Sequence, residues 1–233
     1  MGASMLRVGF IGALSASFAE SVRARLSVPC EIVTIDEADI VALLPEIDVL
    51  VTLVFTPAMA AAAQRLRLVQ VPGAGLDRID RAALPATASL ANAYGHETGI
   101  AEYVLGAMLA MSRGFGRLDA ALRAGRWESQ WAPGMPPPPW PELAGRTLGI
   151  LGYGHIGQAL ARRARAFEME VLAIRRAAPP SDPYATVYGA DGLDDVLARA
   201  DYLAITLPLT PATRGLIAHR ELRRMKANAV LVN

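Results

Sequence analysis

Three glycines, spaced Gly152-x-Gly154-x-x-Gly157, follow a short apolar stretch and precede an Ala/Leu-rich helical one. In a strand–turn–helix setting the first glycine permits the tight turn, the second lets backbone approach a pyrophosphate, and the third lets helix and strand pack closely. The N–H groups that begin the helix then face the anion. We therefore predict a dinucleotide site that also includes His155 and Ile156. A tight turn without a ligand is the alternative, but the flanking strand and helix favour binding.

A basic pair, Arg175 and Arg176, follows the next apolar stretch, Val171 to Ile174. NAD-preferring enzymes usually carry an acidic residue about 20 positions past the glycine motif, bonded to the ribose hydroxyls. Arginines at this place would instead bind a 2′-phosphate through their guanidinium groups. The pair predicts NADP as the cofactor, with NAD possible. The alternative is a solvated basic pair at the end of a strand.

The elements that must position these residues alternate between strand and helix. Apolar stretches predict strands at 6–11, 31–35, 49–54, 68–71, 89–91, 147–151, 171–174, 202–207 and 229–232. Helical segments between them favour the α/β class, with two Rossmann-like, doubly wound parallel-sheet domains. We place the first domain at residues 1–98 and the second at residues 99–233.

A long amphipathic stretch, about 99–122, opens the second domain. Its apolar positions have helical spacing and predict a core-packing helix: Ala101, Val104, Leu105, Met108 and Met111. The Pro- and Trp-rich segment 127–141 follows, and we interpret it as a loop between domains.

The composition describes a core-forming protein, because 53% of the residues are hydrophobic and 19% are charged. A net charge of +1 argues against nucleic acid or an anionic membrane as the main partner. The single cysteine, Cys30, excludes an intrachain disulfide framework and a cysteine-based zinc cluster, so no metal site is predicted. No signal peptide is recognisable at the N-terminus, and the longest apolar run, 49–63, is too short for a membrane span. We therefore expect a cytoplasmic protein.

Five segments in order resemble the D-isomer-specific 2-hydroxyacid dehydrogenase family, in particular its glyoxylate/hydroxypyruvate reductases. They are Val71-Pro-Gly-Ala-Gly-Leu-Asp77, Ile100-Ala-Glu102, the stretch 142–157 with the glycine motif, Leu207-Pro-Leu-Thr-Pro-Ala-Thr-Arg214 and Met225-Lys-Ala-Asn-Ala-Val-Leu-Val-Asn233. The resemblance implies a flavodoxin-like substrate domain followed by an NAD(P)-binding Rossmann domain that is incomplete at its C-terminus. It also implies hydride transfer between NADPH and a 2-keto or D-2-hydroxy acid such as glyoxylate or hydroxypyruvate, and a homodimer at full length.

The resemblance assigns further site residues. The amides of Ala74 and Gly75 would bind the substrate carboxylate, and Gly-rich turns do form such anion-binding nests. Thr206, Leu207 and Pro208 would line the adenine and ribose side of the cofactor. A departure from the family lies at Glu168, where glycine is usual; a positive φ there would cost about 1 kcal/mol.

The family's catalytic arginine, glutamate and histidine follow the segment that Asn233 ends. We therefore assign no catalytic residue within the chain and expect the chain as given to lack dehydrogenase activity. His96, His155 and His219 are not interpreted as catalytic; for His96 we favour a surface or capping role. Two alternatives stay open: a non-catalytic dinucleotide sensor or interaction protein, and another family dehydrogenase acting on phosphoglycerate, formate or phosphite.

Overall fold

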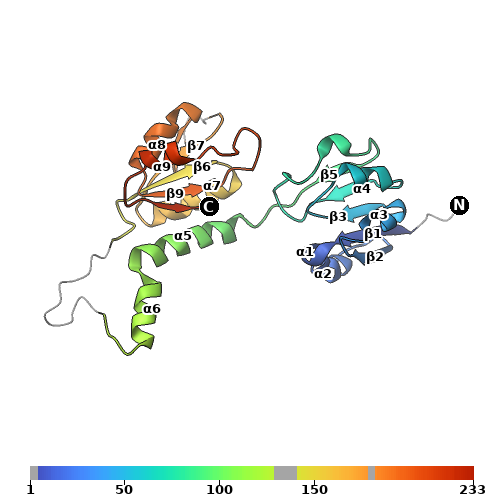
Figure 1. Cartoon of the computed structure of the whole chain (residues 1–233), viewed down its shortest axis with the longest axis horizontal. Helices are drawn as coiled ribbons and strands as arrows, with labels where there is room; N and C mark the ends of the chain where they lie inside the picture. The colour runs from blue at the N-terminus through green and yellow to red at the C-terminus, as the bar shows by residue number, and fades with distance from the viewer. Residues whose placement is uncertain (1–4, 129–140, 178–181) are drawn as a thin grey trace. The chain divides into compact units, whose positions relative to one another are not determined.

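The computed structural model describes residues 5–128, 141–177 and 182–233. Its internal contacts divide the chain into two units, Met1–Tyr94 and Gly95–Asn233. Each unit is built around its own parallel sheet (Figure 1). Most of the segment interpreted as an interdomain loop, 127–141, lies outside the described residues. Within the described ranges, no helix is long and apolar enough to cross a membrane.

The first unit contains five parallel strands in the order β2-β1-β3-β4-β5. The strands are β1 (Leu6–Ile11), β2 (Cys30–Ile35), β3 (Val49–Val51), β4 (Leu68–Gln70) and β5 (Ser89–Ala91). This is the flavodoxin-like order, which switches direction between β1 and β3. The predicted flavodoxin-like domain is therefore confirmed.

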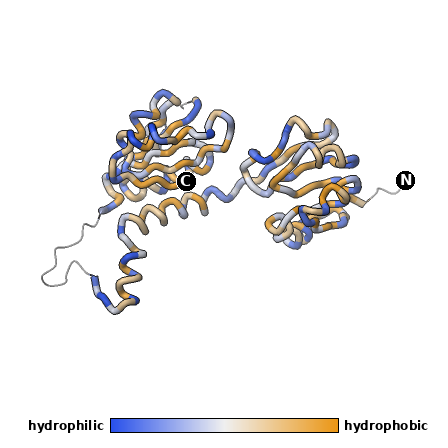
Figure 2. Tube along the Cα trace, in the orientation of Figure 1, coloured by the Kyte–Doolittle hydropathy of each residue, from blue (hydrophilic) through white to orange (hydrophobic). Residues whose placement is uncertain are grey.

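Short helices connect the strands of the first unit. They are α1 (Gly12–Ala16), α2 (Ala19–Arg23), α3 (Ile40–Leu43) and α4 (Pro57–Ala62), with 3-10 turns at Leu44–Glu46 and Arg81–Ala83. Phe10 of β1 and Leu50 of β3 are completely buried, as expected for parallel strands covered on both faces. The strands of both units are correspondingly hydrophobic in Figure 2.

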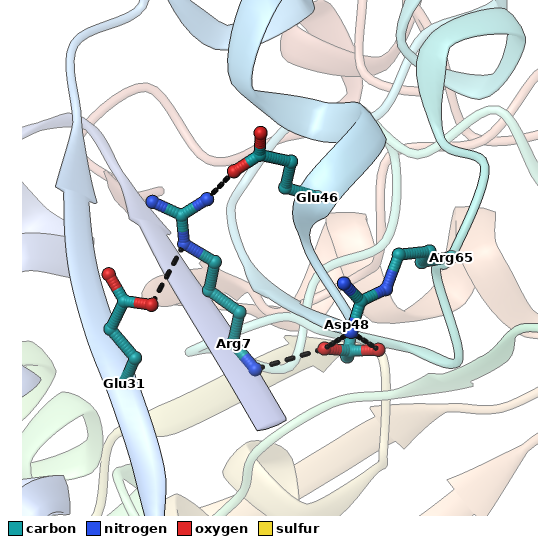
Figure 3. A network of polar contacts seen from close by, with 5 residues as sticks. All are labelled: Arg7, Glu31, Glu46, Asp48 and Arg65. Atoms are coloured by element: carbon teal, nitrogen blue, oxygen red, sulfur yellow. Dashed lines mark hydrogen bonds and ion pairs between the residues drawn. The ribbon is translucent and has the colours of Figure 1, made fainter. Parts of the chain in front are cut away.

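A buried carboxylate, Asp48, fixes the amino end of this sheet (Figure 3). Its Oδ2 accepts the Arg7 amide at 3.0 Å, and both of its oxygens accept from Arg65 Nη2, at 3.1 and 2.9 Å. The Arg7 guanidinium in turn forms ion pairs with Glu31 and Glu46. Because Arg7 lies in β1 and Asp48 directly precedes β3, the carboxylate ties together the two strands at the direction switch.

The second unit contains the strand order β10-β9-β6-β7-β8, again parallel. The strands are β6 (Thr147–Leu151), β7 (Glu170–Ile174), β8 (Thr186–Tyr188), β9 (Tyr202–Ile205) and β10 (Val230–Val232). In chain order this is 3-2-1-4-5, the first five positions of the Rossmann arrangement. The predicted Rossmann-like unit is confirmed.

Two buried clusters cover the faces of this second sheet. One includes Leu148, Ile150 and Val104; the other includes Leu172 and Val196. The helices are α5 (Glu97–Arg113), α6 (Phe115–Arg123), α7 (His155–Ala166), α8 (Leu193–Arg199) and α9 (His219–Arg224), with a 3-10 turn at Ala190–Gly192.

A second aspartate repeats the arrangement of Asp48. Asp201 directly precedes β9, and its Oδ2 accepts the amide of Thr147, the first residue of β6, at 2.9 Å. Its Oδ1 accepts from Lys226 Nζ at 2.9 Å. Although burial alone would raise the pKa of Asp201, these hydrogen bonds and the Lys226 charge lower it.

The structure corrects four points of the sequence analysis in this unit. The long helix is interrupted at Gly114, which has φ +62° and both ends α5 and begins α6. Left-handed backbone of this kind is natural for glycine at a helix end. Met111 was expected in the core, but it is 63% exposed. The short strand β8 was not predicted, and the strand predicted at 202–207 ends at Ile205.

Glu168 lies in the turn between α7 and β7 with φ 58°. Among the described residues it is the only one other than glycine with positive φ. A positive φ was the condition for backbone strain at this position, where the family usually has glycine, and Glu168 meets it.

Candidate cofactor site

The glycine turn lies at the carboxyl end of β6, the central strand of the second sheet. Since β7 and β9 flank β6 and the chain continues in opposite directions on its two sides, this edge is a topological switch point. Open α/β sheets bind ligands in the crevice at such a point. The turn therefore stands where a dinucleotide would be held.

The three glycines differ in what surrounds them. Gly152 has φ +103°, and a Cβ on it would lie 2.8–2.9 Å from backbone atoms of Thr206 and Leu207. A Cβ on Gly157 would lie 2.5 Å from the Gly152 carbonyl oxygen. By contrast, a Cβ on Gly154 would meet nothing within 4 Å. Gly152 and Gly157 thus lie where the backbone leaves no room for a side chain, whereas the space beside Gly154 is open.

Helix α7 begins immediately after the turn, with Gly154 as its N-cap residue. The first N–H groups of a helix have no intrahelical partner and carry a positive partial charge. His155 is exposed and Ile156 is half-buried. The arrangement can accept an anion through backbone groups alone, which fits a pyrophosphate.

The predicted segment Thr206 to Pro208 leaves the same sheet edge, after β9. Thr206 Oγ1 donates to the Gly152 carbonyl at 2.6 Å, and its amide donates to Leu151 O at 2.8 Å. Leu207 is half-buried and Pro208 exposed. The structure thus brings this segment beside the glycine turn, although the Thr206 hydroxyl proton is directed to the turn itself. Contact with a cofactor stays a prediction.

The predicted specificity pair, Arg175 and Arg176, directly follows β7, and both side chains are exposed. The Arg175 amide donates to the Tyr188 carbonyl of β8 at 3.0 Å. Neither guanidinium forms an ion pair or side-chain hydrogen bond with the described part of the chain. Two guanidinium groups without a partner among the described residues therefore lie beside the glycine turn, at the end of the neighbouring strand β7.

Sequence reasoning missed Tyr153, the residue between the first two glycines. Its ring is 1% exposed, and its hydroxyl donates to Asp182 Oδ1 at 2.7 Å. Burial, followed by the hydrogen bond and charge of Asp182, raises the pKa of Tyr153. The motif designates this position as variable, so only the long-range pairing reveals its role.

The predicted substrate turn lies in the first unit, after β4. Asn92 Nδ2 donates to the Ala74 carbonyl at 3.0 Å, and the Ala93 amide donates to Gly73 O at 3.0 Å. Gly75 is exposed, and a Cβ on it would approach Asp77 Oδ1 at 3.1 Å. The turn is well fixed, but the Asp77 carboxylate opposes anion binding at Gly75. Its role stays a prediction.

A cavity of about 330 Å³ that the sequence did not indicate lies at the other switch point, between β1 and β3. Gly12, Thr52 and Met59 contribute to its wall, together with the oppositely charged Glu37 and Arg78. The flavodoxin-like strand order provides the signal for it, since it places a crevice at the carboxyl ends of these two strands.

The histidines occupy helix starts. His96 is half-buried and precedes α5, but its side chain makes no capping bond. His219 Nε2 accepts from Arg223 Nε at 3.3 Å.

The first residue of α5, Glu97, has a lowered pKa. Hydrogen bonds from the amides of Glu97 itself and Gly95 lower it, with smaller contributions from His96 and His155.

Comparison with known proteins identifies the family. Residues 105–233 match the NAD-binding domain of D-isomer specific 2-hydroxyacid dehydrogenases. A hydroxypyruvate reductase of Thermotoga maritima is 33% identical over an alignment of 205 residues that covers 85% of this chain and 64% of that protein. Other curated relatives include D-3-phosphoglycerate and glycerate dehydrogenases.

Two solved structures have the same architecture across nearly the whole chain. A D-isomer specific 2-hydroxyacid dehydrogenase family protein from Aeromonas salmonicida superposes with TM-score 0.80 at 26% identity, covering 98% of this chain and 72% of that one. An NADPH-dependent glyoxylate/hydroxypyruvate reductase from Sinorhizobium meliloti, in complex with NADP and sulfate, gives 0.77 at 26% identity, covering 97% and 69%. The chain belongs to the D-isomer specific 2-hydroxyacid dehydrogenase family.

Proposed function

We propose that this protein is part of an oxidoreductase that transfers a hydride between NADPH and a 2-keto acid or D-2-hydroxy acid. The observation that carries the proposal is the glycine turn at the Rossmann switch point, next to the exposed side chains of Arg175 and Arg176, whose guanidinium groups bind no other described residue. Glyoxylate and hydroxypyruvate are the substrates we favour. The likeness to a hydroxypyruvate reductase and to an NADPH-dependent glyoxylate/hydroxypyruvate reductase supports this substrate class.

The described residues fit a dinucleotide. When bound, the nicotinamide supplies the hydride; the protein's task is to hold and orient it. The open space at Gly154 lets the pyrophosphate approach the first amides of α7. Arg175 and Arg176 would form charge-assisted hydrogen bonds with the 2′-phosphate. The Ala74–Gly75 turn would bind the substrate carboxylate through its amides. We assign the proton donor to no residue of this chain.

The direct test is calorimetric titration of NADPH and NADH against the wild type, Arg175→Ala and Arg176→Ala. One charge-assisted hydrogen bond contributes about 1.5–3 kcal/mol, so NADPH should bind at least about tenfold tighter than NADH. Each substitution should reduce that ratio. Arg25→Ala, which removes the same charge from the first unit, is the control and should leave the ratio unchanged. Equal affinities in the wild type would refute the NADPH assignment.

We also propose a homodimer formed through α5 and α6. Large apolar side chains are exposed along both helices: Tyr103 by 71%, Met111 by 63%, Phe115 by 54% and Leu122 by 58%. Several large exposed apolar side chains on two consecutive helices favour a protein–protein interface there. Light scattering should show a dimer that Tyr103→Glu combined with Met111→Glu disrupts, whereas Leu222→Glu on α9 does not. A monomeric wild type would exclude this interface.

A further inference from the structure

We infer that the hydrogen bond between Tyr153 and Asp182 is a positioning device for cofactor selection, because it holds the arginine-bearing end of β7 against the glycine turn. The inference rests on the proposed NADPH preference. It assigns a role to two residues that would not themselves touch the 2′-phosphate.

The first part of the device is the buried ring of Tyr153. This ring belongs to the same apolar cluster as Leu148 and Leu160, so its position is fixed by packing. Its hydroxyl donates to Asp182 at 2.7 Å across 29 residues of chain. A buried hydroxyl without a partner is destabilising, which makes the pairing obligatory for this rotamer.

The second part is a single oxygen of Asp182. Besides the Tyr153 hydroxyl, Oδ1 accepts the amide of Tyr184 at 2.9 Å and that of Ala185 at 3.1 Å. An aspartate bonded to amides two and three residues ahead closes a local turn. This turn leads directly into β8, which begins at Thr186. Tyr153 therefore determines where the chain enters β8.

The third part is a set of backbone hydrogen bonds that connects the glycine turn and β8 to the arginine-bearing end of β7. The amides of Gly152 and Tyr153 both donate to Ile174 O, at 3.1 Å each, immediately before the basic pair. Arg175 is then held through its amide to Tyr188 of β8 at 3.0 Å. The basic pair is thus fixed on one side by the glycine turn and on the other by β8, and Tyr153–Asp182 joins the two sides.

Loss of the Tyr153–Asp182 hydrogen bond, here called the tether, should weaken binding of the 2′-phosphate and leave binding of the rest of the cofactor unchanged. NADH uses the glycine turn, whose amide bonds to Ile174 do not need the Tyr153 hydroxyl. NADPH additionally needs both guanidinium groups in place. In Tyr153→Phe we expect the ratio of NADPH to NADH affinity to fall about three- to tenfold, as is usual for residues that act through others. NADH affinity should change less than about twofold.

The experiment compares four variants of the full chain by calorimetry with NADPH and NADH. Tyr153→Phe and Asp182→Ala remove the tether from its two ends and should both reduce the ratio. Asp182→Asn keeps an oxygen at Oδ1 that can still accept from the Tyr153 hydroxyl, and it should preserve the ratio. Tyr184→Phe removes a hydroxyl from the same segment, outside the tether, and is the matched control.

Hydrogen exchange gives a readout that needs no cofactor. The amides of Tyr184 and Ala185 should exchange faster in Tyr153→Phe than in the wild type. If the wild type prefers NADPH but Tyr153→Phe and Asp182→Ala both keep its ratio, the inference is wrong and the proposed function stands. A wild type without preference for NADPH would overturn the cofactor assignment and the inference together.

Discussion

Substitution of Gly154 by alanine should separate cofactor binding from folding. A Cβ at this position meets no protein atom within 4 Å, and its backbone, with φ −94° and ψ −155°, is extended and accessible to alanine. The expected loss of folding stability is below about 1 kcal/mol, the usual difference between glycine and alanine at an N-cap. The melting temperature should therefore fall by no more than about 4 °C.

The same methyl group would occupy the space through which the pyrophosphate approaches the amides of α7. We expect NADPH affinity to fall at least about tenfold, equivalent to about 1.4 kcal/mol. Gly157→Ala is the matched comparison, because its Cβ would lie 2.5 Å from the Gly152 carbonyl oxygen. That overlap should destabilise the protein by about 1–3 kcal/mol even without cofactor.

Differential scanning fluorimetry, with and without NADPH, and calorimetry on both variants form the assay. The reasoning fails if Gly154→Ala binds NADPH like the wild type, because the pyrophosphate would then not pass this glycine. It also fails if Gly154→Ala is as destabilised as Gly157→Ala, because the space beside Gly154 would then not be open.

Three further predictions concern other parts of the chain. Asp201→Asn should lower the free energy of unfolding by about 1.5–3 kcal/mol. Because the pKa of Asp201 is depressed in the folded state, the stability that its carboxylate contributes is fully present above the unfolded pKa of about 3.9. This contribution disappears as pH falls through the folded pKa. Urea unfolding from pH 7 to pH 3 should show the gap to wild type closing below about pH 4, and a gap independent of pH would contradict this. Glu168→Gly should raise stability by about 1 kcal/mol, since φ is 58° there, and a lower melting temperature would argue against strain. Gly75→Val should raise KM for a 2-keto acid in the full-length protein and leave NADPH affinity unchanged; an unaltered KM would place the carboxylate elsewhere.

Most strands were predictable because they appear as short apolar runs in the sequence, as is typical of parallel strands covered on both faces. β6 shows this best, since all five of its residues are buried and its bounds match the prediction at Thr147 and Leu151. The resemblance to the family implied a flavodoxin-like unit and a Rossmann unit, and the observed strand orders confirm both. The glycine turn was recognisable because Gly152 has a positive φ and a Cβ on Gly152 or Gly157 would collide with neighbouring backbone, which imposes the spacing.

Features that depend on distant or weak signals could not be predicted. β8, Thr186 to Tyr188, has no run of aliphatic residues to mark it, and its pairing with β7 decides its conformation. Gly114 lies within an otherwise helical pattern, where a glycine is often tolerated, so the helix break is not apparent from the sequence. Tyr153 and Asp182 are 29 residues apart, and no local pattern connects them.

The aspartates that precede β3 and β9 influence the geometry at the other end of these strands, the carboxyl end. Asp201 binds the amide of Thr147 at the beginning of β6, which prevents β9 from slipping along β6. A slip of two residues would keep the buried face but displace β9 by about 6.6 Å. Thr206 would then no longer reach the Gly152 carbonyl, which it now contacts at 2.6 Å. A carboxylate at the amino end of the strands thus fixes the strand register, and with it the geometry of the ligand-binding carboxyl end one strand length away. Asp48 fixes the register of β1 and β3 in the first sheet in the same manner.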